Sequence, residues 1–346
     1  MRNTVLSRQG ASADGVPPLS RSVRIIENVG KHIMKQYISV ILIALIVPSV
    51  ALAQTIKVLA GTQKEDILKL SADTKPYILR GDYSIPAGKQ LEIEQGTIVV
   101  AEKGAGISAA GTLLISGTQD APVTFMSKVP GQASWEGIKI QKSDSSRIQF
   151  AIISGAKSGI YVSGCKPEIT GCLLQRNTVG IKVGDYGAGG HPTVTNCVIA
   201  NNNEDGIQLN ASSANMSNCT IVQNGGWGIR GEYYASPKIE RTIISKNKKG
   251  GLYCWLYTCK VEAHGCIIEN NKNCNVQNGS PEDWDFSGNW WGKASTQKLI
   301  KSGDTANLPG ILDGHDKENT GKVRLNEFLR EPPKECGATL KFDPNQ

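Results

Sequence analysis

The sequence predicts an all-β protein, a three-sided parallel β-helix of about ten coils that ends in a short C-terminal tail. Three observations lead to this fold: a six-residue stretch recurs every 22–25 residues, most copies end in asparagine, and a glycine followed by an aliphatic residue comes a few positions later. Each period holds three short runs of alternating apolar residues, which is the pattern of strands, and helical spacing is missing. Three strands cannot bury an apolar face alone, so successive copies are expected to stack.

The recurring stretch defines the register of the coils. Its clear copies are CLLQRN (172–177), CVIANN (197–202), CTIVQN (219–224), TIISKN (242–247) and CIIENN (266–271). AIISGA at 151 and WDFSGN at 284 are imperfect copies. An asparagine amide in a tight turn can donate a hydrogen bond to one neighbouring coil and accept one from the other. We therefore expect a structural asparagine ladder of Asn177, Asn202, Asn224, Asn247, Asn271 and Asn289.

Cysteine opens four of the five clear copies. Nine cysteines in an exported chain suggest disulfides, and the odd number leaves at least one thiol unpaired. Like residues of adjacent coils lie about 4.8 Å apart, a distance that a disulfide can span. Side chains of one column point the same way, however, so free, buried, packing thiols are the favoured interpretation.

The beginning of the chain has the pattern of a targeting sequence. Lys35 precedes the apolar run ISVILIALIVPSVALA, and Ala51-Leu52-Ala53 is a small-x-small cleavage signal. We expect residues 34–53 to be a signal peptide, with an uncleaved anchor helix as the alternative. Residues 1–33 would be an upstream extension that is disordered or, if Met34 is the start, not translated. The remainder divides into a lead-in at 54–80, the β-helix at 81–292 and a tail at 293–346.

Charge excludes nucleic acid as the expected partner. Residues 1–53 hold six of the 38 Lys and Arg and two of the 31 Asp and Glu, so the formal net charge falls from +7 to +3 without them. Such a balance lacks the basic excess of a nucleic-acid-binding protein. Paired CxxC motifs are also missing, which argues against a zinc site. We expect a monomer, no metal in the coils and no transmembrane span after cleavage.

Several segments resemble a known family. The lead-in GDYSIPAGKQLEIEQGTIVV (81–100), the segment SWEGIKI (134–140), the closing SGNWWG (287–292) and the tail ILDGHDKENTGKVRL (311–325) are similar to those of secreted right-handed β-helix proteins, whose fold relatives are the pectate lyases. The resemblance covers about residues 78–330 and implies a right-handed coil. It does not imply catalysis, because the calcium-binding aspartates of pectate lyases and the NTD, DD, GHG and RIK motifs of polygalacturonases are missing.

One outward column combines cations with aromatic rings. Beside the glycine-aliphatic markers the outward residues can stack on sugar rings and pair with carboxylates. Ordinary strand-surface composition explains the same residues. The candidate ligand-binding residues are Lys139, Tyr161, Lys182, Arg230, Tyr253 and Trp255, with Gln208 in the same column.

A second face carries paired charges. The register places Lys238 beside Glu262 and Glu240 beside His264 on neighbouring coils. These four residues could perform general acid–base catalysis. A cross-strand ladder of salt bridges is the favoured interpretation, because such surface pairs are common.

Two further segments are candidates. The long turn GDYGAGGH (184–191) would project Asp185, Tyr186 and His191 from the rod. The tail segment DKENTGKVRLNE (316–327) partly matches a calcium-binding loop, although the resemblance of the tail explains the same residues, and we expect no other cofactor.

Taken together, the sequence predicts an exported protein of the periplasm, cell surface or extracellular space. Its expected function is to display a face that binds a polysaccharide or a cell-surface partner without catalysis. The alternative is a carbohydrate-active enzyme, a lyase or glycoside hydrolase that acts on an acidic polysaccharide.

Overall fold

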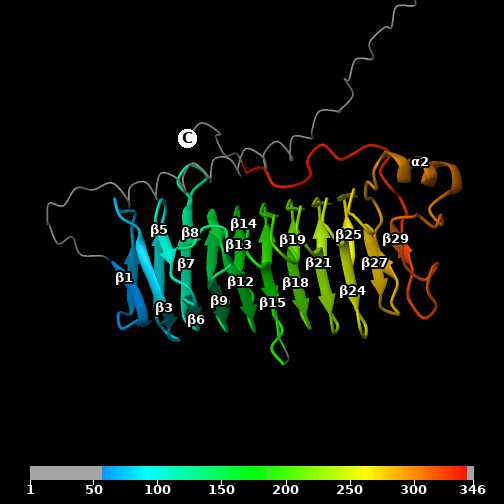
Figure 1. Cartoon of the computed structure of the whole chain (residues 1–346). Helices are drawn as coiled ribbons and strands as arrows, with labels where there is room; N and C mark the ends of the chain where they lie inside the picture. Colours follow the sequence, from blue (N-terminus) through cyan, green and yellow to red (C-terminus); the bar gives the residue numbers. More distant parts are fainter. Residues whose placement is uncertain (1–56, 186, 341–346) are drawn as a thin grey trace, which may run out of the picture.

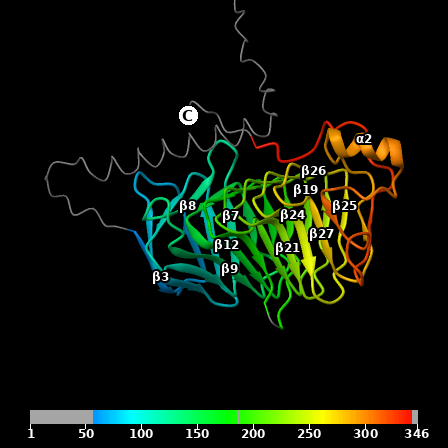
Figure 2. The same ribbon diagram turned by 45° about the vertical axis from the view of Figure 1, so that its right-hand side comes forward.

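The computed structural model describes residues 57–185 and 187–340, which form one rod of stacked coils (Figures 1 and 2). All strand pairs in the two sheets are parallel, and the sheets have 19 and 11 strands. The all-β prediction of a right-handed parallel β-helix of about ten coils is confirmed. The expected signal peptide and upstream extension lie outside the described residues, and the predicted domain boundaries stay predictions. Within 57–185 and 187–340, the structure contains no helix long and apolar enough to cross a membrane.

Each coil contributes one strand to each of three faces. The charged face is the 11-stranded sheet of β2 (Ile67–Leu70), β4 (Gln90–Glu94), β7 (Thr112–Ser116), β10 (Arg147–Gln149), β13 (Glu168–Thr170), β16 (Thr193–Thr195), β19 (Asn215–Ser217), β22 (Lys238–Glu240), β25 (Glu262–His264), β28 (Trp284–Asp285) and β30 (Val323–Arg324).

The 19-stranded sheet bends to form the other two faces. The Cys–Asn face holds β5 (Ile98–Ala101), β8 (Val123–Ser127), β11 (Ala151–Ser154), β14 (Leu173–Gln175), β17 (Val198–Ala200), β20 (Thr220–Val222), β23 (Ile243–Ser245) and β26 (Ile267–Glu269). The Gly-Ile face holds β6 (Gly106–Ala109), β9 (Trp135–Gln141), β12 (Ala156–Ser163), β15 (Val179–Val183), β18 (Ile207–Asn210), β21 (Trp227–Glu232), β24 (Gly250–Trp255), β27 (Val276–Gly279) and β29 (Ile311–Leu312).

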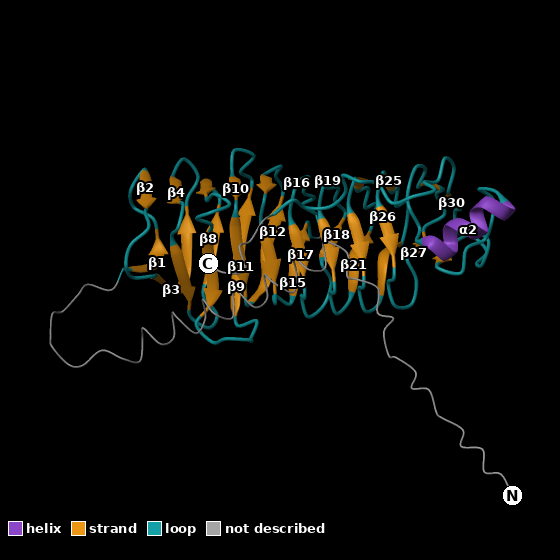
Figure 3. Cartoon of the chain, turned by 90° about the horizontal axis from the view of Figure 1, so that it is seen from above, coloured by secondary structure: helices purple, strands orange, loops and turns teal. Residues whose placement is uncertain are grey.

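The rod has different structures at its two ends. At the N-terminal end the long strand β3 (Tyr77–Ile85) pairs with β5 and β6 and is flanked by β1 (Val58–Thr62). At the other end the helix α2 (Lys293–Ser302) packs beyond the last full coils (Figure 3).

The sharp corners of the coil depend on residues in the left-handed region. The corner between the charged and Cys–Asn faces uses Gly171 and Gly265 in some coils and Asn196 and Asn218, at φ 53° and 52°, in others; Phe150 and Arg241, at φ 47° and 43°, form it in two more. Glycine and asparagine tolerate this conformation best, so a strand can change face within one residue. The three-faced cross-section follows from these corners.

Buried asparagines connect neighbouring coils at the turn into the Gly-Ile face. The Asn224 side-chain amide donates to Ile199 O at 3.1 Å and to Asn247 Oδ1 at 2.9 Å. Its Oδ1 accepts from Asn202 N at 3.1 Å and Asn202 Nδ2 at 2.9 Å. The same pattern runs along four more turns at Asn177, Asn202, Asn247 and Asn271, the last of which bonds to Asn275.

Asn289 does not belong to this column, so its assignment from the alignment needs correction. Its Oδ1 accepts from Cys266 N at 2.7 Å, and its amide donates to Ala263 O and Phe286 O. The position next to Cys266 is the one that cysteine occupies in earlier coils. The imperfect copy at 284 is therefore five residues out of register: Asn289 follows Cys266 by 23 residues, an ordinary repeat spacing, but follows Asn271 by only 18.

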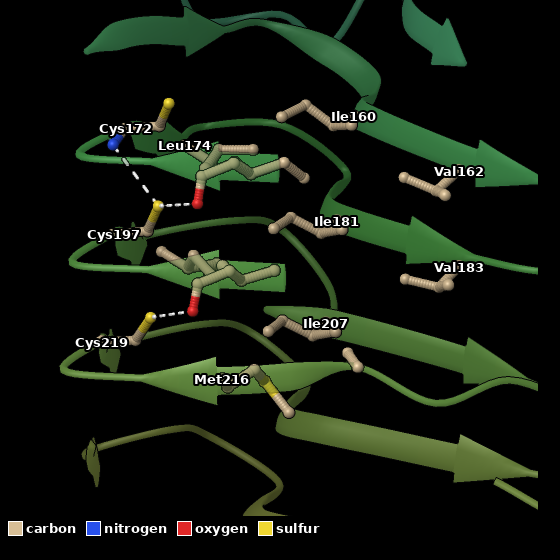
Figure 4. Close-up of a cluster of buried hydrophobic side chains, with 14 of the residues drawn as sticks. Ile160, Val162, Cys172, Leu174, Ile181, Val183, Cys197, Ile207, Met216 and Cys219 are labelled. Atoms are coloured by element: carbon tan, nitrogen blue, oxygen red, sulfur yellow. Dashed lines mark hydrogen bonds between the residues drawn. The ribbon is translucent and has the colours of Figure 1, made fainter. Parts of the chain in front are cut away.

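The cysteine column lines one corner of the core (Figure 4). Cys172, Cys197 and Cys219 have no exposed surface, and each thiol donates to the carbonyl two residues earlier at 3.3 Å. Cys266 repeats this bond with His264 O. All nine cysteines are free thiols in this structure. In this column the thiols pack as small apolar groups.

The C-terminal tail crosses the outside of the Cys–Asn face. In Figure 1 it runs back along the rod from the α2 end. Leu340 packs with the outward side chains Ile152, Leu173 and Val198, and it is itself 1% exposed. Ala338 N donates to Thr220 Oγ1 at 2.9 Å. Strands of this face are therefore buried on both sides, which explains their continuous apolar sequence.

Candidate functional site

The cation–aromatic column is the outward row of the Gly-Ile face. Parallel pairing joins Lys139 to Tyr161, Tyr161 to Lys182, Lys182 to Gln208, Gln208 to Arg230, and Arg230 to Tyr253. All six side chains are half-buried. The coil spacing places neighbouring members about 4.8 Å apart. This row is long enough to contact several units of an extended ligand.

A groove lies over the middle of this row. It encloses about 200 Å³ and is lined by Lys182, Val183, Gln208, Leu209, Asn210, Arg230 and Glu232. Most of these lining groups are amides or charges. The groove is therefore suited to a polar ligand with many hydroxyl or carboxylate groups.

An aromatic wall adjoins the groove on the side of the later coils. The ring centroids of Trp227 and Tyr253 lie 4.9 Å apart, and those of Tyr253 and Trp255 lie 6.3 Å apart, each pair being stacked. Trp255 Nε1 donates to Glu232 Oε1 at 3.1 Å. A Cβ on Gly250 would collide with the Trp227 ring, so this glycine makes room for the stack.

The other end of the row combines two lysines with a tyrosine. Lys139 Nζ and Lys182 Nζ lie 5.0 and 5.2 Å from the ring centre of Tyr161. The Tyr161 hydroxyl donates to Asp185, which comes from the long turn. Burial and this hydrogen bond raise the pKa of Tyr161 to about 12. Within the described part of the chain neither ammonium group has an ion-pair partner. Both cations can therefore pair with a ligand.

Arg230 is held differently, by two carboxylates. Its guanidinium is bonded to Glu232 and lies 3.8 Å from Asp205 Oδ2. Asp205, 3% exposed, also accepts from Trp227 N and from Gln208 Nε2. This buried carboxylate thus contacts two groove residues, Gln208 and Arg230, and the backbone of Trp227 in the aromatic wall. Burial also raises the pKa of Tyr253, so its hydroxyl stays protonated.

Sequence reasoning missed Asp205, Trp227 and Glu232. Asp205 lies in the turn directly before its marker glycine, and Trp227 opens β21 at the same repeat position, where the repeat shows no common residue type. Only their contacts with Gln208, Arg230 and Tyr253 reveal their role. Three exposed or half-exposed tyrosines lie near Trp255: Tyr234 and Tyr257 stack at 5.2 Å, with Tyr233 beside them.

On the charged face, the predicted neighbours lie opposite each other, and each has a bonding partner within the protein. Lys238 bonds Glu262 at 3.2 Å, as a salt-bridge ladder requires. Glu240 lies opposite His264 and pairs with Arg241 at 3.4 Å. The His264 Nδ1 lies 3.1 Å from Ser287 O and Ser287 Oγ. Each of these groups is occupied by a structural partner.

The remaining candidates lie apart from the groove row or at its edge. In the long turn, Asp185 contacts Tyr161, whereas His191 Nδ1 lies 2.6 Å from Ser213 Oγ; Tyr186 is outside the described residues. In the tail, Asp313 organises the loop by accepting from Val323 N and His315 N. Asp316 accepts from Asn307 Nδ2 at 3.0 Å. The calcium interpretation stays a prediction.

Solved structures show similar coils at low identity. A crystal structure of pectate lyase Pel9A matches at 13% identity and a TM-score of 0.41, covering 71% of each chain. A mutant of the periplasmic alginate epimerase AlgG matches at 11% identity and a TM-score of 0.39, covering 79% of this chain and 76% of that one. At this low identity and TM-score, neither an active site nor a substrate can be inferred for this chain. No curated protein sequence matches the chain significantly.

A protein-family model matches a large, continuous part of the chain. The family is described as periplasmic copper-binding protein (NosD), and the match spans residues 89–303, more than half of the sequence. These residues run from β4 through the coils that carry the groove to the end of α2. The chain therefore belongs to the NosD family of periplasmic β-helix proteins.

Proposed function

We propose that this protein binds an acidic polysaccharide or a cell-surface glycan along the Gly-Ile face, without converting it. The observation that carries the proposal is the groove itself: unpaired Lys139 and Lys182 at one end, a stacked Trp227–Tyr253–Trp255 wall at the other, and amide and charged groups between. Cations recognise carboxylates, and aromatic rings bind the apolar faces of sugars.

The absence of catalysis in this proposal rests on the partners of the ionisable groups. Glu240 is paired with Arg241, His264 with Ser287, and Glu262 with Lys238. A general base must reach the proton that it removes, and these groups are engaged elsewhere. In the groove, Asp205 is bonded to Trp227 N and Gln208 and serves to orient them.

Copper, which the family description names, does not fit the donors that residues 57–185 and 187–340 present. Copper(I) prefers thiolates, and all nine cysteines lie in the described residues. Among residues 57–185 and 187–340, however, no group of three or more His, Cys, Asp and Glu side chains is placed to hold a metal ion. Burial raises the pKa of Cys197 and raises that of Cys266 to about 12, which keeps both as neutral thiols. The proposed function therefore includes no metal.

Binding and turnover assays on the same purified protein test the proposal. With polyuronates as probes, we expect saturable binding that Arg230→Ala and Tyr253→Ala each weaken about fivefold to tenfold, since a lost contact of about 1 kcal/mol changes Kd by that order. After incubation with the protein, the polyuronate should show neither unsaturated-uronate absorbance nor new reducing ends. Turnover that disappears in Glu240→Ala or His264→Ala would establish the carbohydrate-active enzyme instead.

A further inference from the structure

Two cysteines face each other within a single coil. Cys254 points inward near the end of β24, and Cys259 follows after the turn at 255–258. Neither side chain has exposed surface; burial and the contact with Cys259 raise the pKa of Cys254, and the contact with Cys254 lowers that of Cys259. Cys259 Sγ also lies 3.5 Å from both Trp255 O and Leu256 O, on the inner side of that turn. Both sulfur atoms therefore occupy the same corner of the core.

The neighbouring coil keeps space for these sulfur atoms. Gly231 is the strand partner of Cys254, and Ala235 O accepts from the Lys260 N–H next to Cys259. A Cβ added to Gly231 would collide with Cys254 Sγ and would lie 2.9 Å from Ala235 Cβ. Glycine and alanine, the two smallest residues, thus stand opposite the pair. A larger side chain at Gly231 would displace Cys254 Sγ.

The repeat cysteines are arranged in another way. Cys172, Cys197 and Cys219 come from successive coils, and their side chains point in the same direction (Figure 4). Each thiol lies within hydrogen-bond distance of a carbonyl of its own coil, and Cys197 also contacts the thiols of Cys172 and Cys219. A disulfide needs a torsion near 90° about the S–S bond, which parallel side chains do not present. The short distance between these thiols is therefore not sufficient for a disulfide.

We propose that Cys254 and Cys259 are a dithiol that is oxidised to an intramolecular disulfide. The family is periplasmic, and the bacterial periplasm is kept oxidising by thiol–disulfide exchange. The thiolate of one cysteine attacks the disulfide of the donor, and the second thiolate then displaces the donor's remaining sulfur. One S–S bond forms in the protein, one breaks in the donor, and the two protons and two electrons leave as two donor thiols.

The burial of the two thiols determines when the disulfide can form. Because the folded coil covers both sulfur atoms, the donor reaches them while the chain folds. The finished bond is then shielded from reductants.

The disulfide would stiffen the aromatic end of the groove. It closes a six-residue ring containing Leu256 and Tyr257, which are both left-handed at φ 62° and 56°. Non-glycine residues hold this conformation only when the surroundings fix it. Within the ring Trp255 stacks on Tyr253, and Tyr257 stacks on Tyr234. The crosslink would keep these rings in place.

Peptide mapping tests the proposal without any substitution. The full chain is reduced, unfolded and refolded with oxidised glutathione, then alkylated in denaturant and cleaved with trypsin. Cleavage after Lys249 and Lys260 isolates both cysteines in one peptide, GGLYCWLYTCK. We expect this peptide to carry no alkyl group, to be lighter by two hydrogen atoms than the dithiol form, and to accept two alkyl groups after reduction.

The chain supplies its own control. Trypsin also yields the peptide 183–230, which holds Cys197 and Cys219 of the repeat column. In the same sample this peptide should carry two alkyl groups. Full alkylation of the 250–260 peptide in correctly refolded protein, or its linkage to a different peptide, would overturn the proposal.

Discussion

A single buried amide links three coils of this protein. Asn224 makes four hydrogen bonds, to Asn202, Asn247 and Ile199, in a turn that water does not reach. Buried polar groups are stabilising only when they are paired, and leaving a partner unpaired costs about 1–3 kcal/mol. The energetic role of one residue here therefore extends to both of its neighbours.

The first prediction concerns this amide. We expect Asn224→Leu to lower the free energy of unfolding by at least about 3 kcal/mol, because Asn202 and Asn247 both lose a partner. Asn203→Leu, an exposed change in the corresponding turn of the preceding coil, should cost little. Denaturant unfolding of both variants checks the prediction, and equal stabilities would show that the asparagines do not support the turns.

Glycine at position 250 allows a second prediction at the residue scale. Gly250→Ala would push the Trp227 ring away from Tyr253, since the added methyl group occupies the space of that ring. We expect weaker polyuronate binding with a nearly unchanged melting temperature. Binding equal to that of the wild type would mean that the aromatic wall does not contact the ligand.

At the scale of elements, the tail stabilises a face that the repeat alone leaves apolar. Residues 336–340 cover the outward side chains of the Cys–Asn face and bond to Thr220, Asn196 and Arg241. The tail thus replaces water along several strands. It contributes burial that the coils cannot obtain from one another.

Leu340 tests this contribution. Leu340→Lys should destabilise the protein by about 2–3 kcal/mol, the scale of burying one leucine side chain, and should increase the binding of a hydrophobic dye. Lys334→Ala, an exposed change in the same tail, serves as the control. If both variants unfold at the same denaturant concentration, the tail does not stabilise the face.

The stability of the folded tail depends on pH through the ionisation of Asp283. Hydrogen bonds from Lys322 N and Arg324 lower the pKa of Asp283, so its ionised form favours the folded tail. This contribution is present above the ordinary aspartate pKa of about 3.9 and disappears as the pH falls through the lower folded-state value. We expect Asp283→Asn to lower the melting temperature at pH 7 and to have no effect near pH 2. An equal difference at both pH values would contradict the assignment.

At the scale of the whole molecule, the fold could be predicted because the same sequence pattern recurs in successive coils. The register placed Lys139, Tyr161 and Tyr253 in one column without any knowledge of the structure. The repeat could not reveal Asp205 or Trp227, because each occurs once in its column and acts through contacts across coils. The tail was equally hidden, since Leu340 packs on residues more than a hundred positions earlier. Features that recur in every coil can be predicted from the repeat, whereas a contact that occurs once between distant residues cannot.

Removing positive charges from two different faces tests whether the glycan binds on the Gly-Ile face. The double variant Lys139→Ala/Lys182→Ala and the double variant Lys238→Ala/Lys260→Ala each remove two positive charges, from the Gly-Ile face and the charged face respectively. Titration calorimetry with an oligouronate should show at least a tenfold higher Kd for the first, about 1.4 kcal/mol of binding free energy, and nearly wild-type affinity for the second. Equal losses in both variants, or a loss only in the second, would contradict binding on the Gly-Ile face.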